Sequence, residues 1–213
     1  MTLILNYLPS ILAITGLMIV ALVSPGPDFA VVVKNSLLYS RKKALLTALG
    51  IACGILFHVT YTLLGFGLII SKSIWLFTIF KYAGAAYLIY IGVKSLKAKK
   101  QEFHFAESKN KKEISSFYAF NNGLLTNILN PKAMLFFVSL FSSLIDPAAP
   151  AVILFIYAII IFFTTLAWFT FVAFCLSSKK SQKYFSKFAH IIERITGGIL
   201  VALGAKLIFV KSN

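Results

Sequence analysis

Residues 23–35 read VSPGPDFAVVVKN, and they interrupt an apolar run that extends from about residue 8 to residue 38. Two prolines, a glycine and an aspartate lie side by side there, from Pro25 to Asp28. A proline inside a helix costs roughly 3 kcal/mol or more. An aspartate at the centre of a bilayer costs about 2.5–3.5 kcal/mol on insertion scales. Because both costs fall at one place, the stretch predicts a functional break in a membrane helix.

The composition of the chain is that of a membrane protein. Of its 213 residues, 59% are hydrophobic and 13% are charged, and the mean hydropathy is +0.88. Soluble domains need more polar surface than this. The net charge of +15 would suggest a nucleic-acid partner in a soluble protein, but the positions of the basic residues explain it without one. Cys53 and Cys175 lie in apolar runs, which favours buried hydrophobes over a disulfide.

Six apolar segments predict six membrane-spanning helices. The segments are 8–38, 44–70, 74–95, 117–144, 150–176 and 190–210. The first and fourth are too long for a straight span, so we expect both to be discontinuous. The sequence thus predicts an all-α polytopic membrane protein.

The basic residues indicate how the predicted helices are oriented. Fourteen Lys and Arg residues lie in alternate loops, within 41–43, 94–112 and 179–187, whereas the opposite loops and tails hold only Lys72 and Lys211. Cytoplasmic loops carry an excess of Lys and Arg. This asymmetry predicts that the basic loops are cytoplasmic and that both termini lie outside.

The two halves of the chain resemble each other weakly. We expect a first three-helix repeat at 1–96, a cytoplasmic linker at 97–116 and a second three-helix repeat at 117–213. SPGP at 24–27 corresponds to NPKA at 130–133. Because three spans is an odd number, the second copy would enter the membrane inverted, as in many secondary transporters with binding sites on broken helices.

The predicted breaks have the chemistry of a zwitterion site. Pro27 suits a first helical position, Asp28 a first turn, and Asn130 an N-cap before Pro131 and Lys132. Free amides at helix starts bind anions, and carbonyls left unpaired by proline can accept from an ammonium group. Non-helical backbone at this depth requires protein or a water-filled cavity around it. The substrate carboxylate would face amides or Lys132, and its ammonium group would face Asp28.

At these residues the sequence resembles the LysE/RhtB family of amino-acid exporters along essentially its whole length. The segments that carry the resemblance are SPGPDFAVVVKNSLLYSRKKALLTALGIACG, KYAGAAYLIYIGVKSLK and NILNPKAMLFF. The resemblance implies a six-helix exporter of the bacterial inner membrane, driven by the proton gradient. It assigns the helix-break motif to Pro25, Gly26, Pro27 and Pro131, together with Asp28, Asn130 and Lys132.

The candidate binding residues each have a structural alternative. The candidates for substrate or proton binding are Ser24, Asp28, His58, Lys81, Asn130 and Lys132. Asp28 could instead cap a half-helix, and Lys132 could extend to the membrane surface. His58 could relay protons or be a hydrogen-bonded core histidine. Lys81 could pair with Asp28 or extend to the outer interface.

Other functions are less consistent with the sequence. The protease and hydrolase motifs H-E-x-x-H and G-x-S-x-G are absent, as is the nucleotide-binding G-x-x-x-x-G-K-[ST], so neither an enzyme nor a cofactor is expected. A metal-ion exporter of the same architecture is the alternative, but Cys53, Cys175 and His58 lack ligand spacing. Gly50 and Gly54 permit close helix contact or a homodimer.

Overall fold

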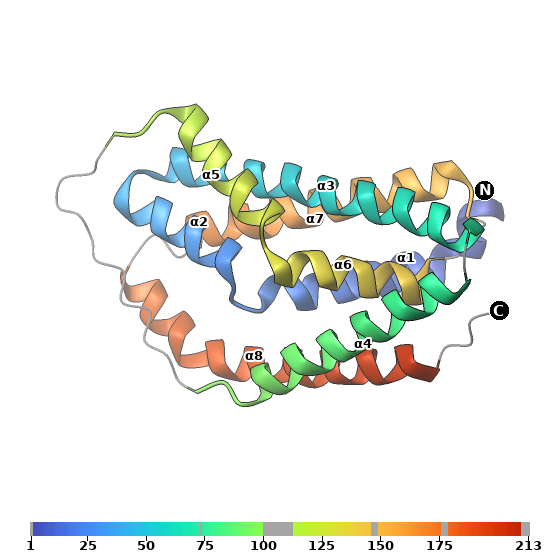
Figure 1. Cartoon of the computed structure of the whole chain (residues 1–213). Helices are drawn as coiled ribbons and strands as arrows, with labels where there is room; N and C mark the ends of the chain where they lie inside the picture. Colours follow the sequence, from blue (N-terminus) through green and yellow to red (C-terminus); the bar gives the residue numbers. More distant parts are fainter. Residues whose placement is uncertain (1, 73, 100–112, 146–148, 176–178, 210–213) are drawn as a thin grey trace.

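The computed structural model describes residues 2–72, 74–99, 113–145, 149–175 and 179–209. Throughout these residues the regular structure is helical (Figure 1). The helices are α1 (Thr2–Val23), α2 (Pro27–Leu38), α3 (Arg41–Lys72), α4 (Ile74–Leu96), α5 (Ser116–Ile128), α6 (Pro131–Leu144), α7 (Ala151–Cys175) and α8 (Lys179–Phe209). The expected all-α architecture is therefore confirmed. Most of the expected linker, residues 100–112, lies outside the described residues.

Several of these helices are long and apolar enough to cross a membrane. In the described residues, four stretches qualify: Leu3–Val23, Arg41–Leu63, Ala151–Cys175 and Lys187–Lys206. The bent pair α5 and α6 brings the number to five if it counts as one span. The chain is therefore a polytopic membrane protein. The third expected segment also forms a helix, α4, but it is not among these candidates, so the sixth span stays a prediction.

Both expected breaks occur, and each has a local cause. Gly26 precedes α2 in an extended conformation (φ −160°, ψ −170°), with Pro27 in the first turn. Proline suits this position because its missing N–H would have no helical partner there. Asn130 precedes α6, and its side chain accepts a hydrogen bond from the Lys132 amide at 3.0 Å. The expected N-cap is thus confirmed, and α5 and α6 meet at 54°.

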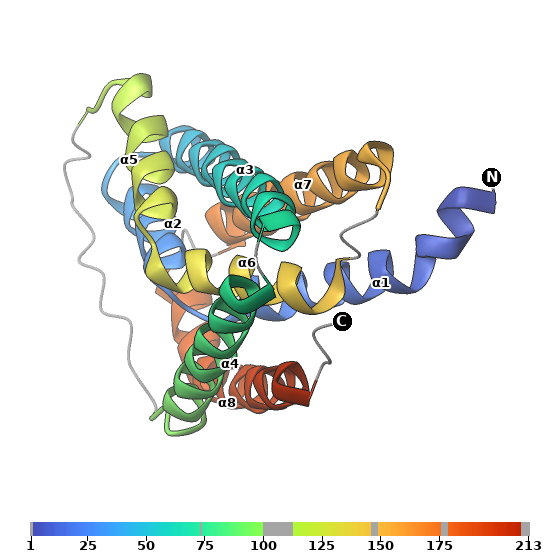
Figure 2. The same ribbon diagram turned by 45° about the vertical axis from the view of Figure 1, so that its right-hand side comes forward.

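Two helix pairs bring their backbones together at glycines. In the first pair, α3 packs along α5, where a Cβ on Gly50 would overlap the carbonyl oxygen of Phe120. The Gly50–Gly54 stretch is therefore used for close contact within one chain. In the second pair, α4 packs along α8, where a Cβ on Gly92 would lie 2.7 Å from the carbonyl oxygen of Gly197. Figure 2 shows this pair side by side as in Figure 1.

The ends of the helices sort into two groups along the bundle. The start of α1 and the end of α8 lie at the same end (Figure 1). The start of α3, the end of α4 and the start of α5 lie at the opposite end, which is the end that carries the basic segments 41–43 and 94–99. The two breaks lie between these ends, where α1, α2, α5 and α6 converge.

Candidate functional site

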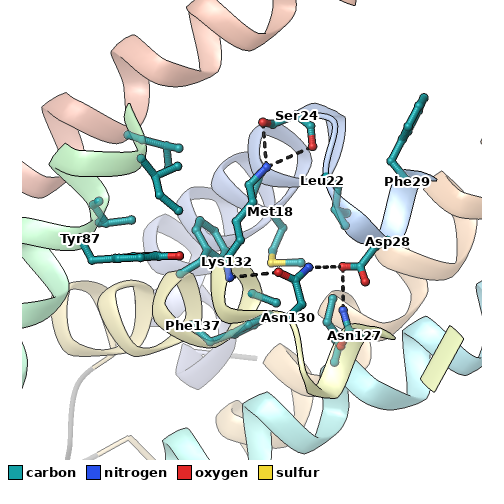
Figure 3. Close-up of a pocket in the computed structure, with 18 of the residues that line it drawn as sticks. Met18, Leu22, Ser24, Asp28, Phe29, Tyr87, Asn127, Asn130, Lys132 and Phe137 are labelled. Atoms are coloured by element: carbon teal, nitrogen blue, oxygen red, sulfur yellow. Dashed lines mark hydrogen bonds between the residues drawn. The ribbon is translucent and has the colours of Figure 1, made fainter. Parts of the chain in front are cut away.

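A cavity of about 60 Å³ lies where the two breaks meet, and every helix contributes to its wall. Since one water needs roughly 10–15 Å³ by this measure, the cavity has room for about four to six waters. Its polar wall comes from the two breaks, from the end of α5 and from Tyr87 on α4, and most of the rest is apolar (Figure 3). The polar residues that line it are Ser24, Asp28, Tyr87, Asn127, Asn130 and Lys132. The cavity that the sequence predicted at the breaks is therefore present.

The Asp28 carboxylate joins the two halves of the chain. Its Oδ2 accepts hydrogen bonds from Nδ2 of Asn127 and from Nδ2 of Asn130, each at 3.0 Å. The start of α2 has no side-chain cap, so the Asp28 side chain does not serve as one. Oδ1 of Asp28 is buried without a hydrogen-bond partner. One oxygen is thus held by neutral donors and the other remains available to a donor.

Lys132, which follows the second break, contacts the first break at Ser24. Its ammonium group donates to the Ser24 hydroxyl at 2.8 Å and to the Ser24 carbonyl oxygen at 3.2 Å. Its stem passes Gly26, where a Cβ would lie 3.7 Å from both Cδ and Nζ of Lys132. A carbonyl at the break does accept a hydrogen bond from an ammonium group, as the sequence suggested, and this ammonium group is that of Lys132. Because an ammonium group has three donors, one remains after the two bonds to Ser24.

His58 lies behind the site rather than in the cavity wall. It is 1% exposed, its Nε2 lies 2.9 Å from the carbonyl oxygen of Asn127, and its Nδ1 lies 3.0 Å from the Tyr61 hydroxyl. Its ring also stacks on Phe137. The hydrogen-bonded core histidine, one of the two interpretations from the sequence, describes this position.

Lys81 does not lie in the site. It is 2% exposed, and its ammonium group lies 4.7 Å from the ring centroid of Tyr82. It does not line the cavity, and the hydrogen bonds to Asp28 come from Asn127 and Asn130. The pairing of Lys81 with Asp28, one of the two interpretations from the sequence, is therefore not seen.

Two polar residues of the cavity wall, Asn127 and Tyr87, were not among the candidates from the sequence, and Asn127 is the one that contacts Asp28. It is fully buried, lines the cavity and donates to Asp28. The available signal was its spacing from Asn130, because residues three apart on a helix share a face. In the sequence NILNPK, both asparagines precede the break.

The soft metal ligands of the sequence do not converge. No group of three His, Cys, Asp or Glu side chains that could hold a metal ion occurs within the described part of the chain. Cys53 is half-buried on α3 and Cys175 is exposed at the end of α7.

Known proteins similar to the chain include both named transporters and unassigned membrane proteins. Threonine efflux proteins of Salmonella typhi and of Escherichia coli (strain K12) are 39% and 38% identical to it over 192 residues, which is 89% of this chain and 93% of each relative. An uncharacterized membrane protein of Bacillus subtilis (strain 168) is 37% identical over 204 residues, 92% of this chain and 97% of the relative.

No solved structure matches the chain. The family model of the LysE type translocator matches residues 19–211, which include both helix breaks and every residue that lines the cavity except Met18. The resemblance drawn from the PGP and NPK motifs is confirmed, and the chain belongs to the LysE type translocator family.

Proposed function

We propose that the chain is a secondary transporter that exports small, uncharged amino acids across the bacterial inner membrane in exchange for protons. The observation that supports this most strongly is the meeting of two helix breaks around one half-buried acid and one half-buried base. Asp28 comes from the first half and Lys132 from the second, and both line the same cavity. Ionisable groups within a membrane are expensive, and they mark substrate and ion pathways.

The charges of the cavity favour a zwitterion. Among the described residues that line it, Asp28 and Lys132 are the charged ones, one of each sign. An amino acid presents an ammonium group to Asp28 and a carboxylate to Lys132. The remaining wall is apolar or aromatic, with Met18, Leu88 and Phe137 among its residues, and offers no partner for a charged side chain. A cavity of about 60 Å³ also favours a small substrate.

The relatives agree with this substrate class. Two proteins covered over most of their length are named threonine efflux proteins. Threonine is small and zwitterionic with an uncharged side chain, and we take it as the first substrate to test.

The state of Asp28 supports the proposed exchange with protons. Its Oδ2 is held by two amide groups, and its Oδ1 has no partner. A carboxylate in this environment can hold a proton or an ammonium group on Oδ1, but not both at once. Competition of this kind is what antiport requires, because arrival of one ligand then releases the other.

The architecture that we propose has six spans in two inverted three-helix repeats. Two equivalent helices of such repeats, α4 and α8, pack antiparallel, since Gly92 contacts Gly197 whereas Gly204 contacts Ala85. The breaks occur at matching places, before α2 in the first half and before α6 in the second. Transporters of this type bind substrate between their repeats on broken helices.

Counterflow in proteoliposomes tests the proposed function. Vesicles loaded with unlabelled threonine should accumulate external labelled threonine without nucleotide. Serine and alanine should compete for this uptake, whereas lysine and glutamate, each in excess, should compete poorly because their side chains are charged. An acid pulse outside should drive export, and a protonophore should abolish that drive. Absence of threonine counterflow, or competition by lysine equal to that by serine, would contradict the substrate class.

Labelling of single cysteines tests the topology, with the native Cys53 and Cys175 replaced first. A cysteine at Ala98 should react only after the membrane is opened, because we place the end of α4 in the cytoplasm. A cysteine at Pro150 should react with an impermeant reagent from outside. The opposite pattern at either position would overturn the orientation.

A further inference from the structure

Asn127 is held from two sides by α3. Its main-chain carbonyl oxygen accepts a hydrogen bond from Nε2 of His58 at 2.9 Å. Its side-chain Oδ1 faces Gly54, where a Cβ would lie 2.9 Å from that oxygen and 3.0 Å from the Cβ of Asn127. The side chain therefore fits only because position 54 has no Cβ. Both contacts fix where Asn127 lies before any substrate is present.

The hydrogen bonds determine which way the Asn127 amide faces. Its Nδ2 donates to Oδ2 of Asp28, while its Oδ1 is buried without a partner. The reverse orientation would place an acceptor against the carboxylate, which accepts only. An unpaired buried acceptor lowers the stability of the folded state, so this orientation of the Asn127 amide destabilises the fold at Oδ1. What the orientation provides in return is the hydrogen bond from Nδ2 to Asp28.

The same face of α3 also contacts α6, the helix that begins after the second break. The Tyr61 hydroxyl lies 3.0 Å from Nδ1 of His58 and 3.4 Å from the carbonyl oxygen of Met134. Asn127 belongs to α5 and Met134 to α6. His58 and Tyr61, both on α3, thus contact the helices on the two sides of the break between α5 and α6.

We propose that Asn127 is a positioning residue, which is held by Gly54 and His58 and orients the Asp28 carboxylate toward the ammonium group of the substrate. This inference rests on the proposed function, in which Asp28 binds that group. With Oδ2 held by Asn127 and Asn130, the carboxylate cannot rotate, and Oδ1 is the oxygen presented to the substrate. Without Asn127, one donor remains and the carboxylate turns about it. The affinity for substrate should then fall while the maximal rate changes little.

Two variants of Asn127 separate positioning from packing. The assay is threonine exchange at equal pH on both sides, so that no gradient contributes. Asn127→Leu keeps the size but loses the donor, and we expect its KM to rise about tenfold or more with a maximal rate near that of wild type. Asn127→Asp places two carboxylates together, and such a pair shares one proton. The shared proton restores the lost hydrogen bond.

The pH profile is therefore the deciding measurement. Asn127→Asp should approach the wild-type KM at acid pH and approach the KM of Asn127→Leu as the pH rises. Lys132, His58, Tyr61 and Glu193 titrate or carry charge near this network, and they are the same in both variants. A packing role predicts that the KM of Asn127→Asp exceeds the wild-type KM by the same factor at every pH, and that result would overturn the proposal.

Glycine variants test the support from α3. Gly54→Ala places a methyl group against the Asn127 side chain, and we expect a KM as high as that of Asn127→Leu. Gly198→Ala meets nothing within 4 Å and should behave as wild type. A Gly54→Ala KM no higher than that of Gly198→Ala would overturn the role of Gly54.

The outcomes for the two proposals are distinguishable. If Asp28→Asn exchanges threonine normally, both the proposed function and this inference fail. If Asp28→Asn is inactive but Asn127→Leu has the wild-type KM, the positioning role alone fails.

Discussion

Asp28→Asn is expected to abolish gradient-driven export while the protein still inserts and accumulates normally. An asparagine at position 28 can accept through its carbonyl oxygen from Asn127 and Asn130, which now donate to Oδ2 at 3.0 Å. The substitution therefore keeps the shape and removes only the charge. Loss of one partner of a buried charged pair costs about 2–5 kcal/mol, which corresponds to a loss of roughly 30-fold or more.

The measurement is threonine efflux from loaded vesicles at matched protein levels, over a range of pH. Glu113→Gln provides the control, because it makes the same change of charge at an exposed residue outside the helices. It should export as wild type does. Equal efflux by Asp28→Asn and wild type at every pH would show that the carboxylate has only a structural role.

Lys132→Met should weaken the binding of every amino acid by a similar factor, because the carboxylate is common to all of them. Loss of a hydrogen bond to a charged group predicts about a tenfold to hundredfold weaker affinity. Competition against labelled threonine by serine, alanine and glycine measures it, with Lys206→Met as the control at an exposed position at the end of α8. A factor that differs strongly between these substrates would indicate that Lys132 contacts side chains instead.

The positions of the breaks could be predicted because they depend on local sequence. Proline stops a helix wherever it occurs, and an asparagine before a proline caps the next one. Residues 24–27 and 130–133 carry these signals, and helices end or begin there in the structure. The cavity could also be predicted, since open backbone in a membrane needs polar surroundings.

The pairing of side chains across the breaks could not be predicted. The sequence suggested that Lys132 awaits a substrate carboxylate, but in the structure its ammonium group already donates twice to Ser24. The contact of Asn127 with Asp28 joins residues far apart in the chain. Such contacts depend on how α2 and α5 pack, and no periodicity encodes that.

The depth of His58 and Lys81 in their predicted spans was likewise not enough to predict whether either side chain reaches the breaks. Both are buried, at 1% and 2% exposure, and both lie within predicted spans. Only His58 faces the break, because its side of α3 packs on α5. A count of residues gives the depth of a side chain in the membrane, but its direction is set by the neighbouring helices.

The central claim is that Asp28 and Lys132 bind opposite ends of one zwitterion. Equilibrium binding to the purified protein tests it with three ligands: threonine, threoninol without the carboxylate, and 2,3-dihydroxybutanoate without the ammonium group. Wild type should prefer threonine to both analogues. Lys132→Met should bind threonine no better than threoninol but should still prefer threonine to 2,3-dihydroxybutanoate. Asp28→Asn should bind threonine no better than 2,3-dihydroxybutanoate but should still prefer threonine to threoninol. If each variant keeps the wild-type preference over the analogue matched to it, these residues do not hold the two charged groups of the substrate.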